Sequence, residues 1–250
     1  MGLIITAELA YGHYLEKVHY NTDEYDEKRD KKVIRASNGG RCHRLQKYHL
    51  SDVEPKKLDK SSMQIFRIGD IFHNELQQGM KWLIEEKNKD KNLTLEMEKK
   101  VSVKIYGLEI EGHFDIRLFD HENKVIQITD IKTMNPRAFG YFKRDPYNKK
   151  GAIIQLGAYI YATKEEFPDY DLVVLLTGWD KDKGNFAEFE IDATRALKAF
   201  HDYYSDLSDS LELDLEDLVP IKHRFSPMEA WECNYCNYNH VCPSPKIKRV

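Results

Sequence analysis

The chain has 250 residues and a formal net charge of −4 at pH 7. Hydrophobic residues make up 41% and charged residues 32% of it, a balance that is typical of a globular protein and excludes an intrinsically disordered one. Because the net charge is weakly negative, any contact with a polyanion such as DNA must come from local basic patches.

The first residues lack the basic segment and the long apolar segment of a secretory signal. No apolar run approaches the ~18–20 residues that a membrane-spanning helix needs. We therefore expect a cytoplasmic protein with no membrane partner. In that reducing compartment, cysteines hold metals more often than they form disulfides.

Hydrophobic periodicity predicts helices and strands along the chain. Apolar residues at three- and four-residue steps from Ile65 to Leu83 indicate an amphipathic helix, and the alternation that begins at Val101 indicates strands. Ser37 is a candidate helix cap. The order predicts an α/β fold with a central mixed sheet flanked by helices. In chain order, we expect helices over about 37–50 and 62–86, strands over 101–105, 108–119 and 125–132, a helix over 148–163, strands over 172–176 and 186–191, and a helix over 192–207.

Charged residues stand at the end of the apolar strand that contains Ile131. Asp130 and Lys132 are two positions apart, so their side chains share one face of that strand. If Asp115 lies on the adjoining strand, the two carboxylates can meet around one divalent ion, and such oxygen ligands suit Mg2+ or Mn2+. A bound ion would activate water toward a phosphodiester, and a lysine would orient that water. A solvated ion pair is the simpler interpretation, but the apolar strand favours the functional one.

The four cysteines form a second motif. Cys233, Cys236 and Cys242 have the spacing C-x2-C-x5-C near the C-terminus, whereas Cys42 stands alone near the N-terminus. Thiolates at this spacing can converge on one metal ion or cluster, and Cys42 would then join the two ends of the chain. Zinc, an iron–sulfur cluster and a pair of disulfides are the alternatives.

Together the motifs resemble a known family, the PD-(D/E)XK nucleases of the RecB exonuclease type. The likeness covers about residues 35–245. The cysteine pattern resembles the branch of this family that carries an iron–sulfur cluster, which includes AddB nuclease domains and CRISPR-associated RecB-like exonucleases. The residues that carry the likeness to the catalytic motifs are His73 in Gly69-Asp70-Ile71-Phe72-His73, Gly112-x-x-Asp115, Asp130-x-Lys132 and Gln155-x-x-x-Tyr159.

The resemblance implies a restriction-endonuclease-like core with Lys132 as the catalytic lysine. It also implies that Gln155 and Tyr159, one helical turn apart, face the DNA or that lysine. The implied ligands of Mg2+ or Mn2+ are His73, Asp115, Asp130 and the backbone carbonyl of Ile131. The implied ligands of a [4Fe–4S] cluster, with zinc as the rival, are Cys42, Cys233, Cys236 and Cys242.

We expect one nuclease domain over residues 1–250. Within it, residues 1–60 form an N-terminal segment with Cys42, residues 61–210 form the nuclease core, and residues 220–250 form the C-terminal cysteine segment.

A segment that mixes aromatic and basic residues follows the acidic motif. In Phe139-Gly140-Tyr141-Phe142-Lys143-Arg144, the rings of aromatic residues stand beside cations, a combination that suits single-stranded nucleic acid. We therefore expect Tyr141, Lys143 and Arg144 to contact DNA. A loop packed by its own aromatic side chains is the alternative.

These features predict a metal-dependent deoxyribonuclease, specifically an exonuclease that acts on single-stranded or end-exposed DNA. Its setting would be repair, recombination, phage DNA processing or CRISPR adaptation, with a helicase or an adaptation protein as candidate partner. One alternative is a DNA-binding adaptor with an inactive nuclease fold and a structural metal cluster. Another is a zinc-ribbon binding protein on an unrelated α/β fold.

Overall fold

The structure, a computed structural model, divides into two compact units. The sheet unit comprises Val33–Gly40 and Gly69–Asp209, and the cysteine unit comprises Met1–Lys32, Arg41–Ile68 and Ser210–Val250. The residues that the structure describes are 11, 13–20, 33–87, 92–215, 217–218 and 232–242.

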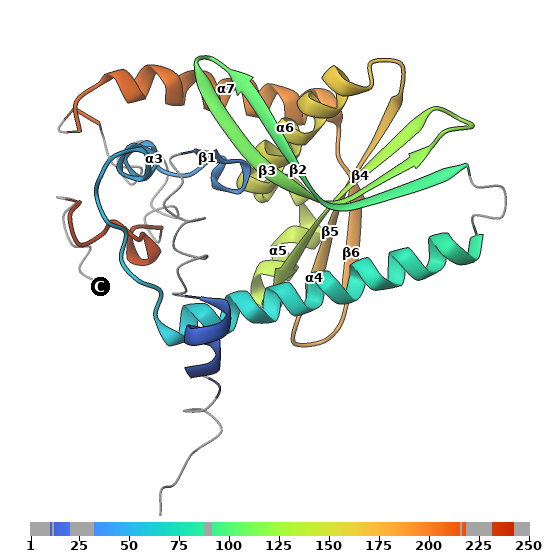
Figure 1. Ribbon diagram of the computed structural model, residues 1–250, viewed down its shortest axis with the longest axis horizontal. Coiled ribbons are helices and arrows are strands. Elements are labelled where there is room, and N and C mark those ends of the chain that lie inside the picture. Colours follow the sequence, from blue (N-terminus) through green and yellow to red (C-terminus); the bar gives the residue numbers. More distant parts are fainter. Residues whose placement is uncertain are drawn as a thin grey trace, which may run out of the picture. The chain divides into compact units, whose positions relative to one another are not determined.

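The sheet unit is built on a six-stranded mixed sheet, which confirms the predicted α/β fold (Figure 1). The strand order is β1-β3-β4-β5-β6, and β2 pairs with β3. The pairs β1–β3 and β4–β5 are parallel and the other pairs are antiparallel. The strands are β1 (Ile34–Arg35), β2 (Leu93–Ile105), β3 (Leu108–Asp120), β4 (Val125–Met134), β5 (Asp171–Asp180) and β6 (Phe186–Glu190).

Helices cover both faces of this sheet (Figure 1). Adjacent residues of β5 point to opposite faces, and they show which helix lies where. The ring of Phe142, on α5, packs so close to Gly178 that a Cβ there would lie 2.4 Å from Cε1. Trp179 instead packs edge-on against Phe72 of α4, with ring centroids 4.3 Å apart. The helices are η2 (Ala36–Asn38), α4 (Lys60–Lys87), α5 (Pro136–Arg144), η3 (Pro146–Asn148), α6 (Lys150–Glu166) and α7 (Ala193–Glu212); α4 and α7 extend into the cysteine unit.

The core of the sheet unit lies between β4 and α6. Ile126 and Ile128, on one face of β4, are fully buried, as are Leu156 and Ile160 of α6. Because α6 is apolar on nearly all sides, it behaves as a buried helix rather than a surface one. Any polar side chain on α6 therefore needs a partner inside the protein.

Two expected boundaries were wrong. The helix expected from Ser37 begins only at His43, as α3 (His43–Leu50). Residues 39 and 40 are glycines, and Gly40 has φ +75, a left-handed conformation that ends the preceding turn instead of continuing it as a helix. Strand β2 begins at Leu93 rather than at Val101, and the two-residue strand β1 was not expected.

The described part of the cysteine unit holds two small apolar clusters. One contains Leu15, Tyr20 and Met63, next to η1 (Leu15–His19). The other, which we call the Tyr48 cluster, contains Leu45, Tyr48 and Tyr238 and joins α3 to the C-terminal segment. Among all described residues, no helix combines the length and the apolar character needed to cross a membrane.

Candidate functional site

Asp115 and Asp130 lie where β3 and β4 separate. The ladder between these strands runs from the pair Asp120–Val125 to the pair Ile116–Thr129. Asp115 and Asp130 are therefore the first residues beyond its last pair, one on each strand. Farther along, β3 pairs with β1 instead. The two aspartates therefore lie at a fork in the sheet, where the pairing of β3 with β4 stops, and the charge of Asp115 acts on Asp130.

His73 approaches Asp115 from α4. Its Nδ1 lies 3.7 Å from Asp115 Oδ1, and Asp115 Oδ2 accepts a 2.6 Å hydrogen bond from the backbone N–H of Ile131. Burial by itself raises the pKa of Asp115, but the neighbouring His73 and the charge of Lys132 lower it overall. Burial by itself lowers the pKa of His73, yet the carboxylate of Asp115 beside it raises the pKa overall. Ile131 thus contributes its backbone N–H to the site. That its carbonyl binds a metal ion stays a prediction.

Lys132 forms an ion pair with Asp130. Its Nζ donates a 2.9 Å hydrogen bond to Oδ1 and lies 2.8 Å from Oδ2. The Asp130 side chain is fully buried, whereas 29% of the Lys132 side chain is exposed. Although Oδ2 is within ion-pair distance of Nζ, the angles do not suit a hydrogen bond, and Oδ2 accepts none from any described residue. A buried carboxylate oxygen with a lone pair to spare is a candidate ligand for a cation.

The charges of this site shift one another's protonation. Burial, and to a smaller extent the charge of Asp115, raises the pKa of Asp130 to about 6, despite the opposing effect of Lys132. Burial alone would lower the pKa of Lys132, but Asp130 and Asp115 raise it overall. Lys132 therefore stays protonated, while the carboxylate of Asp130 is held in a site that disfavours its charge.

The donor chemistry of this site suits a hard divalent cation. Two carboxylates and one imidazole, on Asp115, Asp130 and His73, are ligand types that Mn2+ and Mg2+ accept. They do not form a ready coordination sphere, since among the described residues no group of three or more histidine, cysteine, aspartate or glutamate side chains is arranged to hold a metal ion. The residues fit an ion through their donors and through the buried Oδ2 of Asp130.

A chain of hydrogen bonds links Lys132 to α6. Nζ of Lys132 donates to Gln155 Oε1 at 3.1 Å, and Gln155 Nε2 donates to the hydroxyl of Tyr159 at 2.7 Å. That hydroxyl in turn donates to the backbone carbonyl of His113 at 2.6 Å. Burial raises the pKa of Tyr159, and the charge of Asp130 adds to the effect. The tyrosine is therefore neutral. Its hydroxyl donates to the His113 carbonyl and accepts from the Gln155 amide, which holds Gln155 against Lys132.

The aromatic and basic segment is a helix, α5, rather than a loop packed by its own side chains. The Asn135 side chain caps it by accepting a hydrogen bond from the N–H of Ala138 at 2.8 Å, and Pro136 occupies the first helical position. Phe139 and Phe142 are buried. Asparagine followed by proline is a known start signal for a helix, so the sequence did contain the information that predicts this helix.

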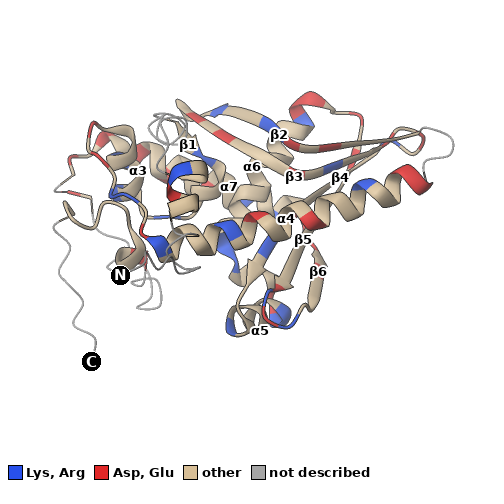
Figure 2. Ribbon diagram, turned by 60° about the horizontal axis from the view of Figure 1, so that its bottom comes forward, with Lys and Arg blue, Asp and Glu red and all other residues tan. Residues whose placement is uncertain are grey.

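The other face of α5 is open to solvent and basic (Figure 2). Tyr141 is 47% exposed, and both Lys143 and Arg144 are exposed. The guanidinium of Arg144 lies 4.8 Å from the centroid of the Tyr141 ring. The three residues that we expected to contact DNA are thus all exposed on α5, and their contact with DNA stays a prediction.

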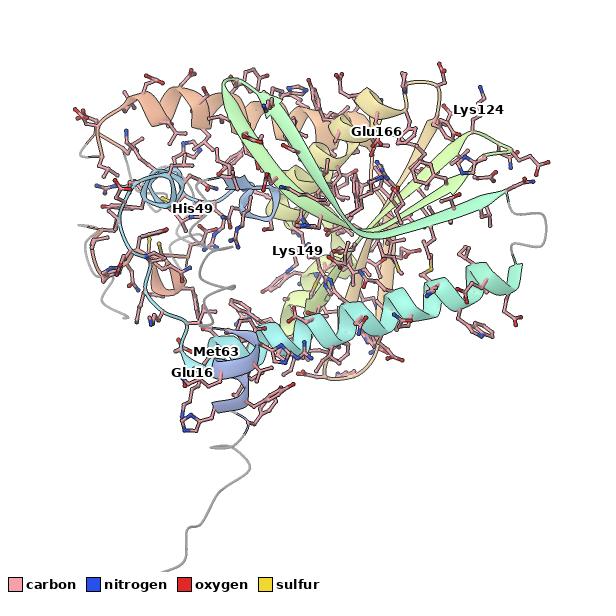
Figure 3. All side chains as sticks on the ribbon, in the orientation of Figure 1. Glu16, His49, Met63, Lys124, Lys149 and Glu166 are labelled. Carbon is pink, nitrogen blue, oxygen red and sulfur yellow. The ribbon has the colours of Figure 1, made fainter. Side chains whose placement is uncertain are left out.

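Sequence reasoning did not single out two residues near the site. Gln77 is buried and donates to the backbone carbonyl of Asp115 at 3.0 Å. It follows His73 by four residues on α4, a spacing that could have marked it as a neighbour. Lys149, which Figure 3 labels together with Glu166 near the two ends of α6, has a pKa lowered by burial and by the charge of Lys132.

The cysteines lie in the cysteine unit and form no disulfide. All four are partly buried, and Cys42, Cys236 and Cys242 pack against the Tyr48 cluster. Burial raises the pKa of the Cys236 thiol to about 11, and the neighbouring Cys42 and Cys242 contribute to this. Segments from both ends of the chain therefore meet here, although the described thiols are not arranged as a metal site.

The chain is similar to a known protein family over most of its length. The sequence model of the PD-(D/E)XK nuclease superfamily matches residues 24–243. No curated protein matches the chain.

Two crystal structures are among the solved structures that match this chain. The crystal structure of SSO0001 is 18% identical, covers 86% of this chain and 88% of its own, and has a TM-score of 0.46. The crystal structure of a candidate exonuclease from Eubacterium rectale is 11% identical, covers 98% of this chain and 97% of its own, and has a TM-score of 0.54. At this identity, the second likeness shows a shared fold.

Proposed function

Because the chain belongs to the PD-(D/E)XK nuclease superfamily, we propose that it is a metal-dependent deoxyribonuclease that acts on single-stranded DNA or on DNA ends. One observation carries this proposal. At the fork between β3 and β4, a protonated Lys132 is held by Asp130 and by Gln155 while its charge reaches Asp115. A carboxylate pair with an adjacent fixed ammonium is the chemistry that phosphodiester hydrolysis needs.

His73, Asp115 and Asp130 would hold Mg2+ or Mn2+. When bound, such an ion polarises the phosphoryl group and lowers the pKa of a bound water. Asp130 offers its buried Oδ2 for this purpose, and the ion would offset the repulsion between Asp130 and Asp115. Because Asp115 Oδ2 is already held by the N–H of Ile131, its Oδ1, which faces His73, is the oxygen that we assign to the ion.

Lys132 would act on the water and on the charge that develops at phosphorus. Its ammonium can hold the attacking water by a hydrogen bond and stabilise the negative charge of the transition state. Gln155 keeps Nζ in place by accepting a hydrogen bond from it, and Tyr159 keeps Gln155 in place by accepting a hydrogen bond from its amide. Both residues of α6 would therefore position the lysine rather than react.

The exposed face of α5 would bind the DNA strand. Tyr141 offers a ring for base stacking, while Lys143 and Arg144 offer charges to the phosphates. The name of the Eubacterium rectale protein, a candidate exonuclease, supports action at DNA ends. Repair, recombination, phage DNA processing and CRISPR adaptation all generate such substrates, and a helicase or an adaptation protein would supply them.

For the four cysteines we propose a structural [4Fe–4S] cluster rather than zinc. Support comes from the spacing of Cys233, Cys236 and Cys242 and from the packing of Cys42 with Cys236 and Cys242 on the Tyr48 cluster. Protein purified without oxygen should then be brown and contain about four iron atoms per chain. Colourless protein with one zinc ion would assign the site to zinc instead.

The activity is tested with end-labelled single-stranded DNA, linear and circular, under Mg2+, Mn2+, Ca2+ or a chelator. We expect Mg2+ or Mn2+ to support degradation of the linear strand, with the circular strand left intact. The matched variant Asp115→Asn should abolish degradation and still bind the strand. Cleavage of the circle would exclude an exonuclease, and no cleavage under any ion would exclude the enzyme.

A further inference from the structure

Strand β2 is distorted opposite Asp115. Glu98 has φ +50, a left-handed conformation that a residue with a side chain adopts at a cost. The ladder between β2 and β3 pairs Met97 with Ile116 and Lys99 with Phe114, and it omits the pair of Glu98 and Asp115 between them. Asp115 therefore lies at a break in pairing with β2 as well as beyond the end of pairing with β4.

The side chains of β3 also stop alternating at this point. Phe114 packs on Tyr159, and Arg117 binds Glu166; both partners belong to α6. Residues three positions apart on a regular strand point to opposite faces. The change of facing occurs between Phe114 and Arg117, and Asp115 lies within it, so the ladder alone does not fix the orientation of this aspartate.

Gln77 provides a hydrogen bond to the Asp115 backbone at the point where the ladder provides none. Its side chain is only 6% exposed, and its Nε2 donates to the backbone carbonyl of Asp115 at 3.0 Å and to Glu98 Oε1 at 2.6 Å. Both amide protons are therefore used, one on each side of the break. Burying an amide is favourable only when such bonds are made, which makes the arrangement specific to this geometry.

We propose that Gln77 is a positioning residue that holds Asp115 opposite His73. It shares a face of α4 with His73 because the two are four residues apart, so its bond to the Asp115 backbone sets the distance between that helix and the carboxylate. The inference rests on the proposed function, because it concerns the assembly of the same metal site. The bond to Glu98 orients the amide for this purpose.

The test compares Gln77→Met, which keeps the volume and removes both bonds, with Gln78→Met on the exposed side of α4. Mn2+ affinity is measured by calorimetry without DNA, and kcat and KM are measured on single-stranded DNA at saturating Mn2+. Gln77→Met should weaken Mn2+ binding by about 10- to 100-fold and lower kcat, with KM unchanged. Gln78→Met should match the wild type. Wild-type affinity and kcat in Gln77→Met would overturn the proposal.

A second variant separates the two bonds. Exchanging the residues, Gln77→Glu with Glu98→Gln, allows an amide at position 98 to donate to a carboxylate at position 77, but nothing then donates to the Asp115 carbonyl. We expect the exchange to bind Mn2+ as weakly as Gln77→Met, and recovery of wild-type affinity would overturn the proposal.

If Gln77→Met does not fold, the Mn2+ affinity of the double variant Gln77→Glu with Glu98→Gln decides the test by itself. If neither variant folds while Gln78→Met does, Gln77 belongs to the fold and the proposal fails. A wild type that binds Mn2+ but cleaves no DNA contradicts the proposed function, and the affinities then still decide the role of Gln77.

Discussion

The ring of Tyr159 lies against the backbone of Gly112. A Cβ placed on Gly112 would lie 2.9 Å from Cε1 of this ring and 3.2 Å from its hydroxyl oxygen. The close approach lets the hydroxyl reach the carbonyl of His113 at 2.6 Å. Glycine is therefore needed here for space, so that α6 can place Gln155 beside Lys132.

Gly112→Ala should lower the free energy of unfolding by about 1–3 kcal/mol, the usual cost of overpacking. It should also reduce nuclease activity, because the ring and Gln155 must shift. Denaturant titration and a rate assay measure the two effects. The control is Gly79→Ala on α4, where a Cβ meets nothing within 4 Å; it should raise stability by about 0.5–1 kcal/mol. A Gly112→Ala protein as stable as the wild type would show that the space is not needed.

Glu96 forms ion pairs with two cationic side chains in different surroundings. We expect the removal of one to lower the free energy of unfolding more than the removal of the other. Arg117, 1% exposed, donates to Glu96 at 2.7 Å and to Glu166 at 3.0 Å and stacks on Phe114. Arg117→Met should destabilise the fold by about 2 kcal/mol or more, because it breaks a partly buried network and a cation–π contact. Lys99, 47% exposed, lies 2.6 Å from the same carboxylate. Lys99→Met should cost about 0–1 kcal/mol, and equal costs in denaturant titration would contradict this account.

Metal binding should weaken as the pH falls. A proton competes with the ion for the same groups, and the raised pKa values of Asp130, about 6, and of His73 place this competition near neutral pH. Calorimetry with Mn2+ between pH 8 and pH 5 should show the affinity fall by about tenfold for each unit below the pKa of one competing group. An affinity that stays constant over this range would mean that neither group is a ligand.

The salt dependence of DNA affinity tests whether the basic residues of α5 bind the strand. Lys143→Ala and Arg144→Ala should each weaken binding of single-stranded DNA. Each should also reduce the slope of log affinity against log salt by about 0.7 for every phosphate that the side chain neutralises. The control is Lys198→Ala on α7, a 73% exposed lysine paired with Asp202. If all three variants behave alike, α5 is not the surface that binds the strand.

Most of the sheet was predictable, because parts of β2, β3 and β6 alternate in sequence, because β5 is a continuous apolar run and because β3 and β4 are joined by a short turn. That turn places Asp115 and Asp130 on neighbouring strands. The helix α5 was missed because its two buried positions, Phe139 and Phe142, are too few to show a period over nine residues. Only the asparagine and proline at its start indicated a helix.

The residues of the site were more predictable from the sequence than the hydrogen bonds between them. Sequence motifs named Lys132 and Gln155, but not the hydrogen bond between them, which depends on how α6 packs on the sheet. The spacing of Gln77 from His73 could have predicted its place beside the site. Its role could not be predicted, because that role depends on the left-handed conformation of Glu98 and on the break in pairing there. A residue that acts through such backbone geometry has no motif of its own.

The central claim is that Lys132, held by Asp130 and Gln155, drives metal-dependent hydrolysis of DNA. The most direct measurement is the rate at which Mn2+-loaded Lys132→Met degrades linear single-stranded DNA, compared with the wild type and with Lys104→Met, an exposed lysine on β2. We predict that Lys132→Met degrades DNA about 10²- to 10⁴-fold more slowly, with DNA binding retained and Lys104→Met unaffected. A Lys132→Met protein that degrades DNA at the wild-type rate would contradict the account.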